Sequence, residues 1–284
     1  MPMTVTRIFD RTARRLRRDR LARATTSPFE AHVAQLLEER LDSVNRSFER
    51  ALVINCGSGA TSRMLAGRGI AVINVDVGAR FAAAAGGIQC DEDALPRFDA
   101  AFDLVCSPVG LDTVDDLPGA LILARRALLP DGLFLACFPT APSLGVLRRA
   151  SAAADGERAF ARFHPQIDLR GAGDLLVRAG FALPVADGET ITLAYRTLAT
   201  LIDDLRKAGA TNLLVERQGV SRSWLDRATQ AFAAAADDEG RTIETITLAT
   251  LTGWSPAASQ PVAAKRGSAT MRLDEALRQD RPKS

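Results

Sequence analysis

The 284-residue sequence lacks any run of about 18 consecutive apolar residues, so we expect no transmembrane helix. It has only four cysteines, none in a Cys-x-x-Cys pair, and two histidines far from them in sequence. This argues against a disulfide framework and against a zinc site or other metal site. We expect buried, reduced thiols in a reducing compartment. The apolar fraction of 47% excludes a chain that is disordered over most of its length.

Lysine is scarce, since 33 of the 36 basic residues are arginine. The net charge of +2 is unevenly distributed: residues 1–23 hold eight arginines and two aspartates, a net of +6, and the remainder carries −4. This basic arm, 7–23, lacks a set of aromatic residues for stacking bases, so we expect no nucleic-acid binding. It is expected to contact a protein partner or to cover a cofactor site. The chain start has no apolar signal-peptide core, and acidic residues interrupt the arm, which favours a helix over a transit peptide.

Apolar runs alternate with helical patterns along the middle of the chain. The runs at 51–54, 69–76, 101–106 and 133–138 predict strands, 117–129 predicts a helix, and Pro130-Asp131-Gly132 predicts a turn. Strands that alternate with helices through short connections are typical of βαβ units. We therefore expect an α/β fold with a mostly parallel sheet and helices on both faces.

The same patterns suggest how the chain is divided. We expect a basic arm at 1–27 and one domain at 28–254. That domain comprises a cofactor half at 45–140, a helical cap or substrate region at about 140–240, and a final strand at about 242–254. The tail, 255–284, is rich in proline, alanine and charge, so it is expected to pack poorly.

Chemistry-bearing residues follow three of the predicted strands. Gly57 and Gly59 come directly after the first strand, in Asn55-Cys56-Gly57-Ser58-Gly59, where backbone can approach a ligand closely. Asp76 ends the next strand, where a carboxylate can accept both hydroxyls of a ribose. Asp91 follows at the third loop, where it could accept an adenine amino group. Because these loops share the carboxyl edge of a parallel sheet, the set predicts a nucleoside cofactor.

The order of the motifs VINCGSG, VINVDV, CDEDALP, FDLVCSPVGL and LLPDGLFLACF resembles the class I S-adenosylmethionine-dependent methyltransferases, which have a Rossmann-like fold. The resemblance implies that Asn55, Gly57, Gly59, Asp76, Asp91 and Ser107 bind S-adenosylmethionine.

Longer segments narrow the resemblance to one family. FDRTARRLRRDR (9–20), DLPGALILARRALLPDGLFLACF (116–138), the stretch 175–212 and KRGSATMRLDEAL (265–277) are similar to the methyltransferase-fold assembly factor of respiratory complex I. That family is associated with hydroxylation of an arginine in a complex I subunit. Segment 187–212 is also similar to the biotin-pathway malonyl-carrier-protein methyltransferases. The resemblance implies modification of a protein side chain during complex I assembly, in the cytoplasm or, in a eukaryote, the mitochondrial matrix.

The first motif departs from the superfamily pattern at two positions. Val53 stands where an acid normally helps to bind the methionine amine, and Asn55 stands at the first glycine. A lost charge-assisted contact costs about 1.5–3 kcal/mol, roughly a tenfold to hundredfold loss of affinity. Two alternatives therefore stay open beside a protein-modifying enzyme. One is a small-molecule or carrier-protein carboxyl methyltransferase, and the other is a catalytically degenerate assembly chaperone with weakened cofactor binding.

No residue can be assigned as catalytic from the sequence, but three are candidates. Asp112, after the fourth motif, could bind a substrate arginine, because carboxylate–guanidinium pairs are bidentate, or it could be solvated. Tyr195 could position a substrate or pack as an aromatic with its hydroxyl at the rim. His164 is either a catalytic base or a polar loop residue.

Overall fold

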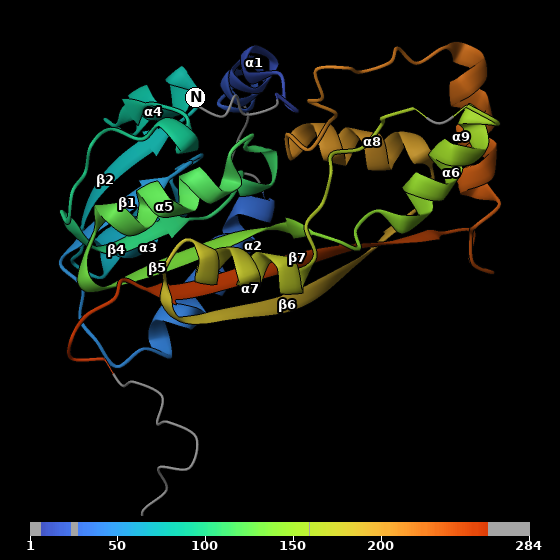
Figure 1. The fold of residues 1–284 in the computed structure, drawn as a ribbon. Helices are drawn as coiled ribbons and strands as arrows, with labels where there is room; N and C mark the ends of the chain where they lie inside the picture. The colour runs from blue at the N-terminus through green and yellow to red at the C-terminus, as the bar shows by residue number, and fades with distance from the viewer. Residues whose placement is uncertain (1–6, 24–27, 159, 261–284) are drawn as a thin grey trace, which may run out of the picture.

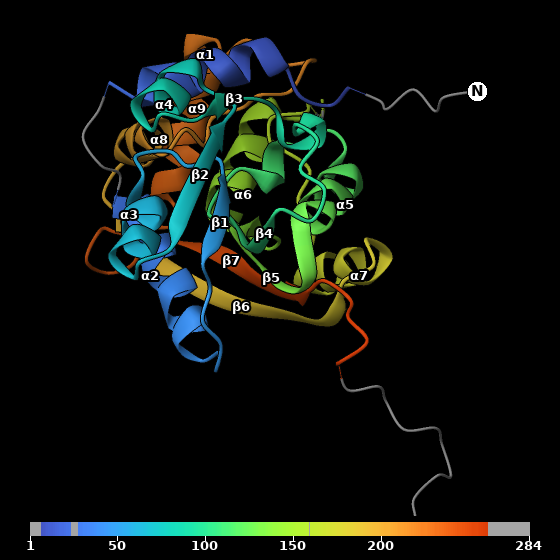
Figure 2. The same cartoon turned by 90° about the vertical axis from the view of Figure 1, so that its left-hand side faces the viewer.

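The computed structural model describes residues 7–23, 28–158 and 160–260. They form a seven-stranded sheet in the order β3-β2-β1-β4-β5-β7-β6 (Figures 1 and 2). The strands are β1 (Arg50–Ile54), β2 (Ala71–Asp76), β3 (Ile88–Gln89), β4 (Phe102–Ser107), β5 (Leu128–Thr140), β6 (Ala182–Tyr195) and β7 (Thr242–Trp254). The first five run parallel, whereas β7 is antiparallel to both β5 and β6. The predicted α/β class with a mostly parallel sheet is confirmed.

Chain order reverses at β1, which pairs with β2 on one side and β4 on the other. At such a reversal the connections leave the sheet in opposite directions, so a crevice forms beyond the carboxyl ends of the strands. The connecting helices are α3 (Ala60–Gly67), α4 (Ala79–Ala84) and α5 (Leu117–Ala127), with short 3₁₀ turns η1 (Glu92–Ala94) and η2 (Leu111–Thr113). The loops expected to bind a cofactor therefore share one edge.

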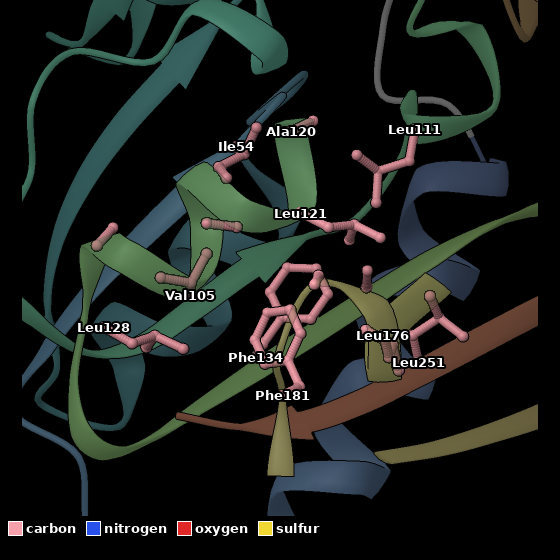
Figure 3. Close-up of a cluster of buried hydrophobic side chains, with 14 of the residues drawn as sticks. Ile54, Val105, Leu111, Ala120, Leu121, Leu128, Phe134, Leu176, Phe181 and Leu251 are labelled. Carbon is pink, nitrogen blue, oxygen red and sulfur yellow. The ribbon is translucent and has the colours of Figure 1, made fainter. Parts of the chain in front are cut away.

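Helices cover both faces of the sheet because the strands are apolar on both sides. Leu52 and Ile54 of β1 face a core shared with α5 and α7 (Leu169–Arg178). Their neighbours Ala51 and Val53 face the opposite core, shared with α2 (Pro28–Asp42) and α3. Figure 3 shows the first core, in which the Phe134 and Phe181 rings stack with centroids 5.0 Å apart. This layered core fixes the strand ends on which the site is built.

Beyond the end of β5, strands β6 and β7 continue as a two-stranded ribbon (Figure 1). The ribbon reaches a third apolar cluster formed by α6 (Gly145–Asp155), α8 (Leu198–Lys207) and α9 (Arg222–Ala233). We call these three helices the cap cluster. The segment 140–240 thus contributes two separate parts, since its α7 and β6 complete the layered domain and only the other helices form the cap cluster.

Helix α1 (Arg11–Leu21) lies at the carboxyl edge of the parallel strands, beside α4 (Figures 1 and 2). Asp10 begins it as the N-cap, accepting a hydrogen bond from the amide of Ala13. Phe9 forms an isolated antiparallel bridge with Leu214, and the two pack with Leu213. The arm is therefore docked against the body of the protein and is not an exposed extension.

The turn predicted at 130–132 is wrong, because β5 runs through it: Leu128 pairs with Phe102 and Leu133 with Leu104, and the extra residues form a bulge with Asp131 at φ 61°. The four cysteines are free, and Cys56, Cys106 and Cys137 are buried as expected, whereas Cys90 is only partly buried. The motif at 265–277, most of the tail and residues 1–6 and 24–27 of the arm lie outside the described residues.

Within the described ranges, no helix combines the length and apolar character needed to cross a bilayer. The same ranges contain no group of three or more histidine, cysteine, aspartate or glutamate side chains arranged to bind a metal ion.

Candidate functional site

The candidate site is the carboxyl edge of β1, β2, β3 and β4. The turn after β1 has a left-handed backbone at Asn55 (φ 57°), Gly57 (φ 53°) and Gly59 (φ 79°). Asparagine tolerates this conformation better than most residues, and glycine adopts it freely. A Cβ on Gly57 would lie 2.5 Å from Oε1 of Glu30 on α2, so a side chain there would displace the Glu30 carboxylate and would also strain the left-handed backbone. The turn that sequence reasoning selected is thus a close backbone approach.

Asp76, at the end of β2, is fully buried. Its carboxylate accepts hydrogen bonds from the amides of Gly57 (2.9 Å) and Gly78 (2.8 Å). It also accepts from Arg18 of α1, whose Nη2 lies 2.8 Å and whose Nε lies 3.3 Å from its two oxygens. The Arg18 guanidinium stacks 4.7 Å from the centroid of the Phe81 ring. The acid expected to bind a ribose therefore binds an arginine of the arm.

Asp91, which precedes η1, is also paired with the arm. Arg15 Nη2 lies 2.6 Å and Arg11 Nη1 3.3 Å from its Oδ2. Arg11 reaches Asp93 at 2.5 Å as well, through Nη2. Burial raises the pKa of Asp93, although the charge of Arg11 opposes that shift. The acid expected near an adenine is thus part of a row of carboxylates along which α1 lies.

Arg14 forms the most deeply buried pair of this edge. Its Nη1 donates to Oε2 of Glu92 at 2.6 Å, and its Nη2 donates to the other oxygen of Glu92. The two side chains are 7% and 2% exposed. Asn55 also donates to Glu92 through Nδ2, and to the carbonyl of Val109 at 3.1 Å. The non-glycine residue of the turn therefore has a definite role, which is to help bind the carboxylate that binds Arg14.

The arginines and Glu92 are site residues that sequence reasoning did not identify. Arg11, Arg14, Arg15 and Arg18 are spaced by three or four residues, so they share one face of α1. Asp91, Glu92 and Asp93 are consecutive, and Asp115 accepts from the amides of Ile8 and Phe9 as well as from Arg11. The helical spacing of the arginines was the available signal, but it does not reveal which acids they meet.

Several buried polar atoms at this edge have no hydrogen-bond partner among the described residues. They are Asn55 Oδ1, Ser58 Oγ, Asp91 Oδ1 and Ser107 Oγ, from the loops after β1, β3 and β4. Buried polar groups are normally paired, so a concentration of unpaired ones points to a ligand. Together with the glycine turn and Asp76, they fit the nucleoside part of S-adenosylmethionine.

The methionine part fits less well. Val53 is fully buried in the apolar core beneath α2 and α3, so nothing at that position provides a carboxylate for the amine. The residues present thus fit the nucleoside part of the cofactor, and Val53 offers its amine no charged contact.

Asp112, in η2, lies next to the Arg14 pair and is partly buried. Burial raises the pKa of its carboxyl group to about 6, against the opposing effect of the Arg14 charge. A carboxylate with this pKa changes charge near neutral pH. Asp112 therefore adjoins the candidate cofactor site, on the side of the loop after β4.

Tyr195 and His164 lie elsewhere. Tyr195 is buried among the cap cluster, where burial raises the pKa of its hydroxyl to about 12. His164 accepts a hydrogen bond from the amide of Leu213 through Nε2 (2.8 Å), with its ring edge-on to Phe9 at 5.2 Å. Burial, with the charges of Arg17 and Arg148, lowers the pKa of His164 to about 4. His164 is thus a hydrogen-bond acceptor beside the arm, and the catalytic-base interpretation stays a prediction.

Comparison with known proteins gives relatives of two kinds. A family described as a methyltransferase domain matches residues 52–136. Arginine-hydroxylase NDUFAF5, mitochondrial, from Mus musculus is 30% identical over 94% of this chain and 83% of its own length. Malonyl-[acyl-carrier protein] O-methyltransferase from Xylella fastidiosa is 39% identical, over 46% of this chain and 43% of its own length.

Solved structures agree on the fold. The YcgJ protein of Bacillus subtilis superimposes with a TM-score of 0.56, covering 80% of this chain and 99% of its own, at 16% sequence identity. The sheet and its flanking helices are those of a Rossmann-like class I methyltransferase.

Proposed function

Since the chain belongs to the arginine-hydroxylase NDUFAF5 family, we propose that it binds S-adenosylmethionine and modifies a protein side chain, an arginine, during respiratory complex I assembly. The similarity to NDUFAF5 spans 94% of the chain, whereas that to the carrier-protein methyltransferase spans 46%. The proposed location is the cytoplasm, or the mitochondrial matrix if the protein is eukaryotic.

One observation carries the cofactor part of the proposal. Asp76, with its carboxylate bonded to the amide of Gly57, lies beside Asp91 at a single sheet edge, where buried polar atoms lack partners. Asp76 would bind the ribose hydroxyls, Asp91 the adenine amino group, and the Gly57–Gly59 turn would approach the cofactor through backbone. The bound cofactor would supply an electrophilic methyl group on a sulfonium centre.

Asp112 is the residue we assign to the acceptor. A guanidinium and a carboxylate form two parallel hydrogen bonds, which fixes the acceptor's orientation as well as its position. Group transfer of this kind depends mainly on holding two reactants in line, so it needs no strong acid or base. Because the pKa of Asp112 is about 6, its carboxyl group becomes negatively charged as the pH rises through that value, and it then binds a cationic acceptor more tightly.

Calorimetry of the full chain with S-adenosylmethionine tests the cofactor assignment. We expect measurable binding, and Asp76→Asn is expected to weaken it about tenfold or more through loss of a charged acceptor. Thermal unfolding of the variant checks that it is folded. Absence of binding at millimolar ligand, both by the unaltered chain and by a variant that lacks arginines of α1, contradicts the proposal.

Mass spectrometry then identifies the reaction. The full chain is incubated with arginine-bearing segments of complex I subunits or with a malonylated carrier protein. A methyl group on an arginine nitrogen, formed together with S-adenosylhomocysteine and a released proton, supports transfer from the sulfonium centre. An added oxygen supports hydroxylation of the arginine, which requires an oxidant such as dioxygen in the assay because the cofactor's methyl group supplies no oxygen atom. A methyl ester on the carrier protein supports the carboxyl methyltransferase alternative instead.

A second candidate function is an assembly chaperone without catalysis. It is favoured by the burial of Val53 in apolar core and by the arginines of α1 bonded to Asp76 and Asp91. Under that proposal, complex I assembly fails in cells that lack the gene, and expression of the Asp76→Asn variant restores it because cofactor binding is not needed. Failure of this variant to restore assembly, while it remains folded, favours the enzyme.

A further inference from the structure

The acceptor capacity of Asp76 is fully used in this structure. A carboxylate offers about four lone-pair sites. The Asp76 carboxylate accepts four hydrogen bonds, from the amides of Gly57 and Gly78 and from Nε and Nη2 of Arg18. No acceptor position is left for a ribose while Arg18 is in place.

The same conflict recurs along the edge. Asp91 accepts from Arg11 and Arg15 on the oxygen Oδ2, and Arg14 lies between Glu92 and the carbonyl of Gly110, to which its Nη2 donates at 3.0 Å. These partners come from the loops after β3 and β4, on either side of the Asn55 turn. The four side chains of α1 therefore span the whole candidate cofactor site from the ribose acid to the loop after β4.

We propose that this acidic edge is a binding site for an arginine-bearing helix, that α1 is its intramolecular occupant, and that α1 and a nucleoside cofactor exclude one another there. The proposal rests on the cofactor binding proposed above. The guanidinium of Arg18 occupies the acceptors of Asp76 that ribose hydroxyls need. Those of Arg11 and Arg15 occupy Oδ2 of the acid assigned to adenine, whose Oδ1 has no partner among the described residues.

The attachment of α1 suits an element that moves away. Within Arg11–Leu21, all of which the structure describes, Arg14 is the one buried residue, and Leu16 is 52% exposed. The apolar anchor lies just before the helix, where Phe9 packs on Leu213 and Leu214. Loss of the ion pairs can thus free the helix from the acids while the chain stays attached at Phe9.

A helix that closes over a bound cofactor as a lid is the competing arrangement. In a lid, ligand and helix stabilise each other, so arginine removal weakens ligand binding. If α1 and the ligand exclude one another, the ligand binds only to molecules in which α1 has left the site. The apparent dissociation constant then equals the intrinsic one divided by the fraction of such molecules. Removing the arginines raises that fraction and therefore tightens binding. The two arrangements thus predict changes of opposite sign.

The first measurement is calorimetry of the full chain with S-adenosylhomocysteine. Arg15→Gln with Arg18→Gln removes the Arg15–Asp91 and Arg18–Asp76 pairs. It leaves the buried Arg14–Glu92 pair and the longer Arg11–Asp91 pair in place. We expect this variant to bind about tenfold or more tightly than the unaltered chain. The matched control, Arg20→Gln with Arg23→Gln, removes the same charge from exposed positions and is expected to change affinity less than about twofold.

The second measurement is amide hydrogen exchange with and without S-adenosylhomocysteine. Exchange in α1 is expected to accelerate when the ligand binds, whereas exchange in α9 stays unchanged. Slower exchange in α1, or equal or weaker ligand binding by the double variant, overturns the proposal while leaving the proposed function intact. Absence of binding by the unaltered chain and by both variants at millimolar ligand overturns the proposed function itself, and the exchange with it.

Discussion

Helices α1 and α9 both lie outside the layered core, but they are attached by opposite means. Phe232 and Ala228 of α9 are buried against α6 and α8 in the apolar cap cluster. Helix α1 buries Arg14 and lies on carboxylates through three further arginines. Apolar burial is insensitive to salt and has no competitor for its contacts, whereas a guanidinium–carboxylate pair can be replaced by another polar ligand.

The contrast separates a permanent element from an exchangeable one. Breaking apart a buried ion pair costs less when both charges return to water, or to a new partner, than when one is left buried. The cap cluster is thus expected to unfold with the domain, and α1 to detach before it.

Phe232→Ala is expected to destabilise the protein by about 3–5 kcal/mol, because it leaves a cavity where an almost fully buried ring was. Urea unfolding measures the change. Leu225→Ala on the same helix is the control, since Leu225 is 41% exposed and the expected cost is below about 1 kcal/mol. Equal effects at the two positions would mean that α9 is not anchored by apolar burial.

Arg14→Met is expected to cost about 3 kcal/mol, or less if α1 detaches and lets water reach Glu92, because it leaves that carboxylate buried without its cation. Adding Glu92→Leu is expected to restore most of the lost stability and to make detachment of α1 rarer, because apolar contacts replace the ion pair. The same unfolding assay measures both variants. A double variant that is less stable than Arg14→Met alone contradicts this account of the pair.

Acidification is expected to loosen the segment that anchors the arm. The pKa of His164 is about 4 in the folded protein and about 6.5 in the unfolded chain. The contribution of the neutral His164 to the free energy of unfolding is therefore complete above pH 6.5 and is lost as the pH falls toward 4. The expected loss between pH 7.5 and 5 is about 1–2 kcal/mol, read from unfolding at each pH. His164→Gln keeps a side-chain acceptor for the Leu213 amide, and its stability should depend less steeply on pH over this interval.

Salt gives the smallest expected effect. Arg11 and Arg15 are 36% and 46% exposed at their side chains, so their pairs are partly screened in 1 M salt. Amide exchange in α1 is expected to accelerate by a few fold, corresponding to less than about 1 kcal/mol, whereas exchange in α9 does not change. If salt accelerated amide exchange in both helices to the same extent, α1 and α9 would not differ in how they are attached.

The alternation of apolar runs allowed the sheet to be predicted, because short βαβ connections leave few ways to order parallel strands. The turn at 130–132 was misjudged, since Pro130-Asp131-Gly132 marks a reversal locally but is accommodated here as a bulge between two paired segments of β5.

The sequence allowed two groups of residues at the candidate site to be selected separately, but not the contacts between them. Gly57, Asp76 and Asp91 could be selected because each follows a strand, and strand ends of a parallel sheet share an edge. The arginines of the arm could be grouped by their helical spacing. Their pairing could not be predicted, because Arg18 and Asp76 are 58 residues apart and Arg14 and Glu92 are 78 apart. Nothing local in either segment specifies the other.

The sequence by itself determined the α/β class, the glycine turn, the two acids and the division of charge between a basic arm and an acidic body, because these depend on local spacing and composition. The tertiary structure alone decided that the arm lies on the acids and that Tyr195 and Asp112 serve different regions. The physical reason is that long-range electrostatic pairs form only where the folded sheet brings their partners to one edge, whereas periodicity acts within a few residues along the chain.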